Sequence, residues 1–280
     1  MKKTNYHTHS IYSDGKFNLK ENIESAISNN LHILGFSDHC PLPFDSSWAM
    51  KLNDYDTYIN EINELKIQYQ EKIKILAGLE LDYIPEIIDE NNKFFDTEKL
   101  DYVIGSIHLL GDPSNGELWS VDHSFDKIKN GCERDYQGNF RTMVEDYYRR
   151  ILLMAENTKP DIIGHLDLVK IRNTNNRIFN ENESWYLDAV YNALISVKAN
   201  DCIVEINTGG VSRGYTDSFY PSDIILKIIN ELKIPVMINS DAHRIEHICG
   251  KFEEAFEKLK LLGFTELVVI DINGRNFQKL

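Results

Sequence analysis

Residues 73–80 read IKILAGLE, a short apolar run that ends in a glutamate. Comparable runs of four to seven residues, rich in Ile, Val and Leu, recur along the whole chain. Such composition is typical of strands that are buried on both faces of a parallel sheet. The predicted strands lie at 31–36, 73–79, 101–107, 161–164, 202–206, 234–238 and 266–270, with residues 4–9 as a candidate first strand.

Amphipathic helical patterns lie between these runs. Leu19, Ile23, Ala26 and Ile27, for example, share one face of a helix predicted over 19–30. The alternation of strands and helices predicts an α/β fold with a mainly parallel sheet. Seven or eight repeats fit a single barrel better than two domains. The other predicted helices cover 55–72, 140–157, 183–199, 221–232 and 251–262.

No linker rich in Pro, Gly or Ser divides the chain, so we expect one barrel domain over residues 1–280. Two long polar stretches interrupt the alternation, at 111–138 and at 166–182. Long excursions of this kind in a compact domain are often functional loops. We therefore expect both stretches to be insertions beside the functional site.

The charge balance narrows the choice of partners. The chain carries 30 Lys and Arg against 44 Asp and Glu, a net charge of −14. This charge disfavours binding to nucleic acid or to anionic membranes, and no apolar run is long enough to span a bilayer. The four cysteines form no CxxC pair and the N-terminus has no apolar signal segment, so a cytoplasmic location is expected.

Imidazoles and carboxylates follow the predicted strands with unusual regularity. His39 follows 31–36, His108 follows 101–107, His165 follows 161–164, and Glu80 closes the run at 73–79. The carboxyl ends of parallel strands lie on one face of a barrel, where active sites are built. These side chains are therefore expected to converge, although each histidine taken alone would be an ordinary core or surface residue.

Two further groups extend this set. His7 and His9 stand two residues apart on the candidate first strand and should face the same side, with Asp14 in the adjoining loop. Imidazoles and carboxylates are ligands for Zn, Mn or Fe(II), and one ion takes at most six of them. The set therefore predicts two or three ions that share a bridging carboxylate. The predicted ligands are His7, His9, Asp14, His39, Glu80, His108, His165, Asp241 and His243.

The remaining histidines receive different interpretations. His32 lies inside its apolar run and is expected in the core, whereas His247 is expected to be solvated. His123 lies in the long stretch 111–138 and is a lesser candidate for contact with a substrate.

The ordered motifs resemble those of the PHP (polymerase and histidinol phosphatase) superfamily between residue 5 and about residue 245. They are HTHS at 7–10, DG at 14–15, SDH at 37–39, GLE at 78–80, GSIH at 105–108, GH at 164–165 and SDAH at 240–243. Finer features resemble the histidinol-phosphate phosphatase branch: DHCPLP at 38–43, GLELDY at 78–83, GHLDL at 164–168 and EINT at 205–208. The stretch 111–138 matches none of these motifs.

The resemblance implies a distorted, TIM-like (β/α)7 barrel with three divalent metal ions at the carboxyl ends of its strands. It also implies hydrolysis of L-histidinol phosphate to L-histidinol and phosphate in histidine biosynthesis. By motif, one ion would be held by His7, His9, Glu80 and Asp241. A second would share Glu80 and use His108 and His165, and a third would use Asp14, His39 and His243. Their identity, whether Zn, Mn or Fe, is left open.

The expected nucleophile is a metal-bound water, because no P-loop and no Ser-His-Asp arrangement is present. Phosphate oxygens that the metals leave free favour arginine forks. Arg213 and Arg172 lie in loops on the predicted active face and are the candidates for phosphate binding, with Lys170 and Arg177 as weaker ones. The residue that protonates the leaving group is not identified.

The amine and imidazole of the implied substrate could pair with Asp45, Asp122 or Glu117, although ordinary solvation is the better interpretation of each. Two other functions stay open. One is a PHP phosphoesterase for another small phosphate ester or a nucleotide. The other is a non-catalytic metal-binding module, which the full set of candidate ligands disfavours.

Overall fold

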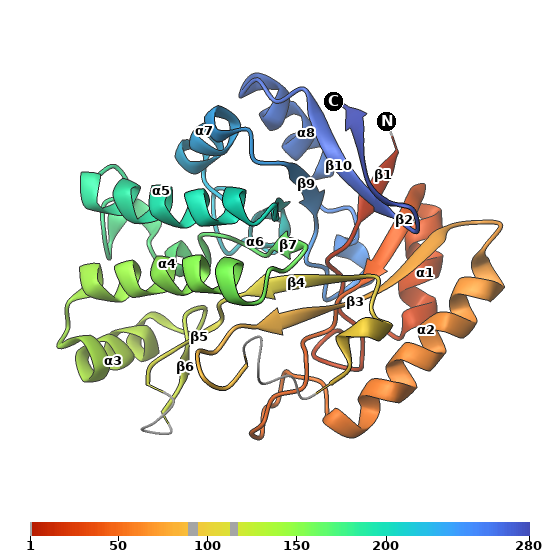
Figure 1. Cartoon of the computed structure of the whole chain (residues 1–280), viewed down its shortest axis with the longest axis horizontal. Helices are drawn as coiled ribbons and strands as arrows, with labels where there is room; N and C mark the ends of the chain where they lie inside the picture. Colours follow the sequence, from red (N-terminus) through yellow and green to blue (C-terminus); the bar gives the residue numbers. More distant parts are fainter. Residues whose placement is uncertain (1, 89–94, 113–116) are drawn as a thin grey trace.

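The computed structural model describes residues 2–88, 95–112 and 117–280. Seven parallel strands form one sheet in the order β1-β2-β3-β4-β7-β8-β9 (Figure 1). The predicted α/β fold with a TIM-like, seven-stranded barrel is thus confirmed. The strands are β1 (Lys3–Asn5), β2 (Leu31–Phe36), β3 (Lys74–Asp82), β4 (Tyr102–Ser106), β7 (Ile162–Ile163), β8 (Ile203–Asn207) and β9 (Val236–Asn239).

The two ends of the sheet meet just beyond β1 and β9. Thr8 forms an isolated parallel bridge with Ala242. The His9 N–H donates to the Ala242 carbonyl at 2.9 Å, and the Ala242 N–H donates to the His7 carbonyl at 3.2 Å. The segments that carry the first and the last predicted ligands are therefore held side by side.

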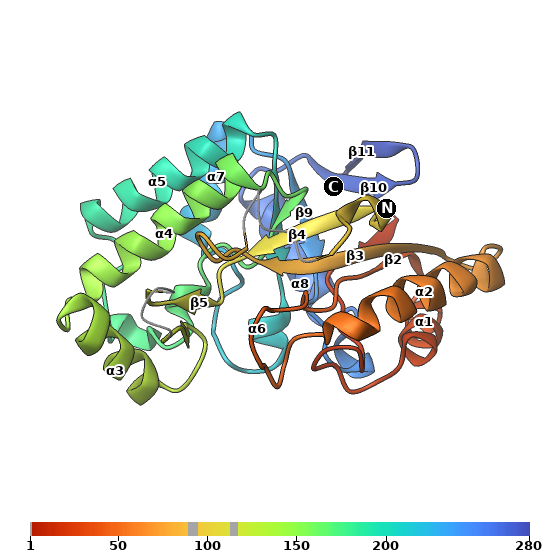
Figure 2. The same cartoon turned by 60° about the horizontal axis from the view of Figure 1, so that its bottom comes forward.

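Helices cover the outside of the barrel, with α1 and α2 on one flank and α4 and α5 on the other (Figures 1 and 2). Asn18 caps α1 in a capping box with Glu21, and the helix buries Leu19, Ile23 and Ala26 against the sheet. The helices are α1 (Leu19–Ser28), α2 (Tyr55–Tyr69), α3 (Phe125–Tyr136), α4 (Phe140–Asn157), α5 (Ser184–Ala199), α6 (Gly209–Ser212), α7 (Asp223–Leu232) and α8 (Phe252–Leu261).

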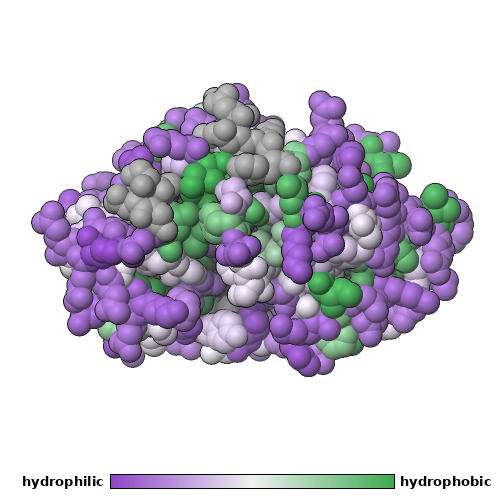
Figure 3. Space-filling model, turned by 90° about the horizontal axis from the view of Figure 1, so that it is seen from below, coloured by the Kyte–Doolittle hydropathy of each residue, from purple (hydrophilic) through white to green (hydrophobic). Residues whose placement is uncertain are grey.

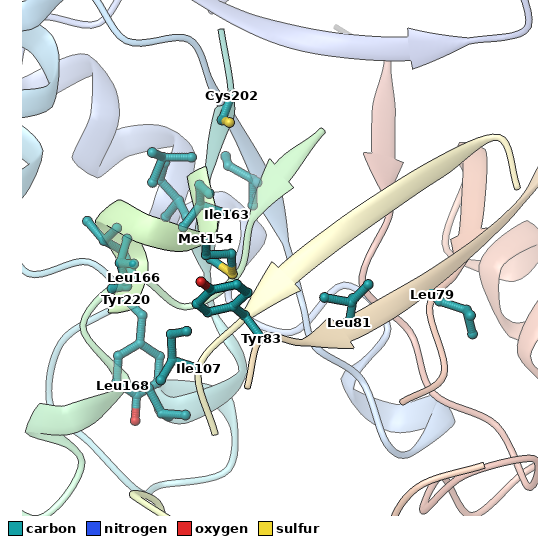
Figure 4. Packing of buried hydrophobic residues seen from close by; sticks show 14 of the residues in the cluster. Leu79, Leu81, Tyr83, Ile107, Met154, Ile163, Leu166, Leu168, Cys202 and Tyr220 are labelled. Carbon is teal, nitrogen blue, oxygen red and sulfur yellow. The ribbon is translucent and has the colours of Figure 1, made fainter. Parts of the chain in front are cut away.

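Side chains along β3 alternate between the apolar core outside the barrel and the barrel interior, where the site lies. Leu79 and Leu81 face outward into the large apolar cluster under the helices, together with residues such as Met154 (Figure 4). Leu76 faces inward and belongs to a second cluster inside the barrel. Because successive side chains on a strand point to opposite faces, Glu80 also faces inward, above this apolar layer.

Gly78 occupies the inward position between Leu76 and Glu80 on β3. A Cβ atom at this position would lie 2.5 Å from Cζ of Tyr102, so only glycine leaves room for that ring. The Tyr102 hydroxyl is close enough to donate to the carbonyls of both Tyr6 and Phe36, at 2.5 and 2.8 Å. The ring therefore fills the barrel interior directly beneath the site.

The structure corrects three strand predictions. The run at 266–270 is β10 (Glu266–Asp271), which pairs antiparallel with β11 (Gly274–Lys279) in a separate two-stranded sheet. The chain reverses at Gly274, whose φ of 101° suits glycine. The first strand ends at Asn5 rather than at residue 9, and β3 continues through Glu80 to Asp82.

β10 closes the amino-terminal end of the barrel. Its Val268, Val269 and Ile270 belong to the same buried cluster as Leu76 on β3. The Tyr6 hydroxyl donates to the Ile270 carbonyl at 2.8 Å. The barrel is thus sealed on the side opposite to the predicted ligands, which leaves the carboxyl-terminal side for the site.

The two predicted insertions differ in secondary structure. The stretch 111–138, of which 113–116 lie outside the described residues, contains β6 (Trp119–Ser120) and α3 rather than only a loop. β6 pairs antiparallel with β5 (Leu109–Leu110). The stretch 166–182 holds only short 3-10 turns, at Leu168–Lys170 and Thr174–Asn176. His32 is exposed, which contradicts its predicted place in the core.

Within the described part of the chain, no helix has the length and apolar character needed to cross a membrane.

Candidate metal centre

The structure brings all nine predicted ligands together at the carboxyl-terminal side of the barrel. His7 and His9 are fully buried at the base of the cluster, each with 0% of its surface exposed. The other seven line a cavity of about 740 Å³. They are Asp14, His39, Glu80, His108, His165, Asp241 and His243.

The first group surrounds Oε2 of Glu80. Nε2 of His7 lies 3.3 Å from this oxygen, and Nε2 of His9 lies 3.5 Å from it. Oδ1 of Asp241 lies 3.6 Å from Nε2 of His7 and 3.3 Å from Nε2 of His9. Two imidazoles and two carboxylates therefore point at one small volume, as the motif grouping predicts.

The second group surrounds the other oxygen of Glu80. Oε1 lies 2.8 Å from Nε2 of His165 and 3.6 Å from Nε2 of His108. The two Nε2 atoms are themselves 3.1 Å apart. The Ser106 hydroxyl donates to Oε1 at 2.6 Å and fixes the carboxylate. Glu80 thus separates two groups of imidazoles, which is the arrangement expected of a bridging ligand.

The third group gathers around Asp14. Its Oδ1 lies 3.2 Å from Nε2 of His243, 3.7 Å from Nε2 of His39 and 3.9 Å from Nδ1 of His9. Nδ1 of His39 also lies 3.0 Å from Oε2 of Glu80. The third group therefore adjoins the first, and all three form one continuous cluster.

The donor atoms of the cluster fit divalent cations. Nε2 of His7, both ring nitrogens of His9, Oε2 of Glu80 and Oδ1 of Asp14 are buried and make no hydrogen bond with the described residues. Buried polar atoms normally have partners, because burial without one costs free energy. A set of imidazole nitrogens and carboxylate oxygens suits Zn, Mn or Fe(II).

Two carboxylates outside the predicted set orient the imidazoles. Oε2 of Glu205 lies 3.0 Å from Nδ1 of His7, and Oδ1 of Asp82 lies 2.7 Å from Nδ1 of His108. A carboxylate at Nδ1 holds the ring proton there and leaves Nε2 free to bind a cation. Both residues carry a signal in the sequence, since each is a charged residue within a buried strand.

Burial and mutual proximity shift the pKa values of the histidines in the cluster. Burial opposes charge on His7, but the carboxylates of Glu205, Glu80 and Asp241 outweigh it and hold the pKa of His7 well above its usual value. Burial and the neighbouring imidazoles of His243 and His39 lower the pKa of His9 to about 3. Without cations, some rings therefore keep a proton that a bound metal would displace.

Both arginines that the sequence identifies as phosphate contacts line the cavity. Nη2 of Arg213 donates to Oδ2 of Asp241 at 3.0 Å. Nε of Arg172 donates to the His123 carbonyl at 2.9 Å. Each guanidinium is thus anchored on the cavity wall near the predicted ligands.

The two weaker candidates point elsewhere. Nζ of Lys170 pairs with Oδ2 of Asp167 at 2.9 Å and donates to the Phe219 carbonyl at 2.7 Å, inside the protein. The Arg177 guanidinium lies 3.5 Å from the centre of the Phe125 ring. Neither side chain lines the cavity of the metal centre, so the structure gives no support to their predicted contact with phosphate.

Several other residues reach the cavity. His123 and Asp122 line it, and so does His247, for which the sequence predicts solvation. Glu117 instead forms an ion pair with Arg134. Trp48, Tyr215, Lys16 and Arg244 also line the wall, and no spacing in the sequence singles them out.

Comparison with known proteins identifies the family of the chain. Residues 5–209 match the PHP domain. The chain belongs to the PHP domain family. This confirms the resemblance seen in the ordered motifs.

Two curated relatives and one solved structure are similar over most of their lengths. The histidinol-phosphatase of Bacillus subtilis is 28% identical over 92% of this PHP chain and 100% of its own length. A Deinococcus radiodurans protein named "Probable histidinol-phosphatase" is 30% identical over 87% of each chain. The histidinol phosphate phosphatase of Lactococcus lactis, solved with zinc, L-histidinol and phosphate, superposes with a TM-score of 0.69 at 22% identity, over 98% of this chain and 99% of that one.

Proposed function

We propose that this PHP protein is a metal-dependent phosphomonoesterase that hydrolyses L-histidinol phosphate to L-histidinol and phosphate in histidine biosynthesis. The observation that carries the proposal is the cluster around Glu80, in which imidazoles approach both carboxylate oxygens within one cavity. Relatives that match nearly the whole chain bear the name histidinol-phosphatase, and the Lactococcus lactis enzyme was solved with the two products of this reaction.

The three groups of side chains would hold three divalent ions, of zinc, manganese or iron. His7, His9 and Asp241 would bind one, His108 and His165 a second, and Asp14, His39 and His243 a third. Glu80 would bridge the first two. Divalent ions in such a site lower the pKa of bound water and neutralise charge on the phosphoryl group.

Two arginines would bind the substrate, and two carboxylates orient the imidazoles of the cluster. Arg172 and Arg213 would contact phosphoryl oxygens from the cavity wall, where their planar groups suit bidentate contacts. Glu205 and Asp82 hold ring protons at Nδ1 of His7 and His108, so that the opposite nitrogens face the cluster. Positioning and charge neutralisation, rather than a covalent intermediate on the protein, would thus drive the reaction.

A panel of phosphate esters tests the proposal. The purified protein, supplied with zinc or manganese, is assayed with histidinol phosphate, nucleoside monophosphates, glycerol phosphate and p-nitrophenyl phosphate. We expect histidinol phosphate to give the highest kcat/KM, of at least ~10⁴ M⁻¹s⁻¹. A clear preference for nucleotides would refute the substrate assignment, and metal-loaded protein that hydrolyses none of the esters would indicate a binding module.

A further inference from the structure

The stretch after β5 folds back against the metal centre. β5 begins directly after His108, and Leu109 pairs with Ser120 of β6. The Val121 N–H then donates to the His108 carbonyl at 2.9 Å. The chain from Ser120 to His123 is therefore fixed beside one of the predicted metal ligands.

His123 stands where two cavities meet. It lines the cavity of the metal centre and also an adjoining cavity of about 600 Å³, as do Ser47, Trp48 and Ser120. Figure 3, a view from below, shows apolar surface near the centre of the molecule between hydrophilic flanks. The apolar side chains that line the adjoining cavity are Phe44, Trp48, Ile87, Leu109, Leu118 and Trp119.

If a phosphate ester occupied both cavities, its phosphorus–oxygen ester bond would lie beside His123. Its phosphoryl group would face Glu80 and Arg172, which line the metal-centre cavity. Its organic part would enter the adjoining cavity, where aromatic side chains offer contact area. The oxygen between these two parts would then lie at the boundary that His123 occupies.

One local hydrogen bond orients the ring of His123 and selects its tautomer. The Ser124 N–H lies 2.7 Å from Nδ1 and donates to it. A ring nitrogen that accepts a hydrogen bond carries no proton, so the neutral ring holds its proton on Nε2. Arg172 donates to the His123 carbonyl at 2.9 Å and ties this segment to the wall formed by 166–182.

We propose that His123 is a catalytic residue whose Nε2–H donates a hydrogen bond to the oxygen that leaves phosphorus. This role rests on the proposed phosphomonoesterase function. The oxygen of water forms a bond to phosphorus, and the bond from phosphorus to the ester oxygen breaks with its electron pair left on that oxygen. One proton of the water ends on the leaving oxygen and the other stays with phosphate. The Nε2–H of His123 stabilises the charge that develops on this oxygen.

Two classes of substrate separate this role from a structural one. An alkoxide is a poor leaving group and depends on stabilisation, whereas p-nitrophenolate is a stable anion. We therefore expect His123→Ala to lower kcat for histidinol phosphate and glycerol phosphate by about 10- to 100-fold, the effect of one hydrogen bond to a charged group. The kcat for p-nitrophenyl phosphate should change by less than about threefold.

Two further variants complete the experiment. His123→Gln keeps a neutral N–H donor at a similar reach and should restore much of the kcat for the alkyl esters. His32→Ala removes the exposed histidine at the second position of β2 and should match the wild type on every ester. Circular dichroism and metal analysis show whether each variant is folded and loaded.

The outcomes are distinct. Equal losses on alkyl and aryl esters, or no loss on either, would overturn the role of His123. If His123→Ala does not fold, the Gln variant decides: a loss of the same size on alkyl and aryl esters would contradict a donor role, whereas a loss confined to alkyl esters, or none, agrees with it. If the wild type hydrolyses glycerol phosphate but not histidinol phosphate, the proposed substrate fails while the alkyl-to-aryl comparison still tests His123. A wild type that hydrolyses no ester refutes both.

Discussion

Replacing Glu80 with glutamine tests the bridging role with almost no change of shape. Oε2 of Glu80 lies 3.0 to 3.5 Å from ring nitrogens of His7, His9 and His39, so a cation between these atoms would be within about 4 Å of the carboxylate. Two unit charges at that separation interact by about 4 kcal/mol at an effective dielectric constant of 20. Since 1.4 kcal/mol is tenfold, the loss for a divalent ion is at least about a thousandfold in affinity.

The assay compares metal content, metal affinity by competition with a chelator, and kcat/KM in wild type and Glu80→Gln. We expect the variant to fold, because the change removes a buried charge without altering volume, and to lose most of its metal and activity. Glu64→Gln, at an exposed position on α2, serves as the control and should behave as the wild type. A Glu80→Gln protein that retains full metal content and full activity would exclude a bridging role for Glu80.

Three further predictions concern the same site. Burial works against charge on His108, but the carboxylates of Asp82 and Glu80 raise its pKa to about 10. The metal-free ring is thus protonated below that pH, so metal binding should release protons and tighten as pH rises from about 7 to 9, which calorimetry in buffers of different ionisation enthalpy measures. Glu205→Gln should weaken metal affinity by about 10- to 100-fold, seen by chelator competition; unchanged affinity would exclude its orienting role. Arg172→Ala should raise the KM for histidinol phosphate about tenfold, whereas the exposed Arg149→Ala should not; equal KM values in steady-state assays would contradict phosphate contact.

The sequence predicts the barrel well because burial leaves a strong pattern. The run at 31–36 becomes β2 without any shift of its ends. The run at 266–270 is equally apolar, yet it forms the antiparallel β10. An apolar run reports burial and not strand direction, so only the chain reversal at Gly274 decides the pairing.

The predicted ligands converge for the same reason that the strands are recognisable. Each follows or ends a buried strand, and the parallel topology brings those ends to one side. The helix α3 is harder to predict, because charged residues surround its few buried positions, Ile128, Gly131 and Cys132. The approach of His123 to His108 depends on the pairing of two-residue strands, which leaves no periodic pattern.

The sequence indicates that the two orienting carboxylates are buried, but not which residues they contact. Glu205 lies within an apolar run and Asp82 two residues beyond Glu80, both on buried strands. A buried carboxylate indicates a polar partner, but the sequence does not say which one. The distances to His7 and His108 identify the partners and assign both residues an orienting role.

Anomalous diffraction from crystals grown with zinc, recorded on both sides of the zinc edge, shows whether this cluster binds several metal ions. We expect strong anomalous peaks within the cluster, with Glu80 between two of them and with His7, His9 and His165 among their neighbours. A map without peaks in this cluster at saturating zinc, or with peaks only at surface residues, would contradict this expectation.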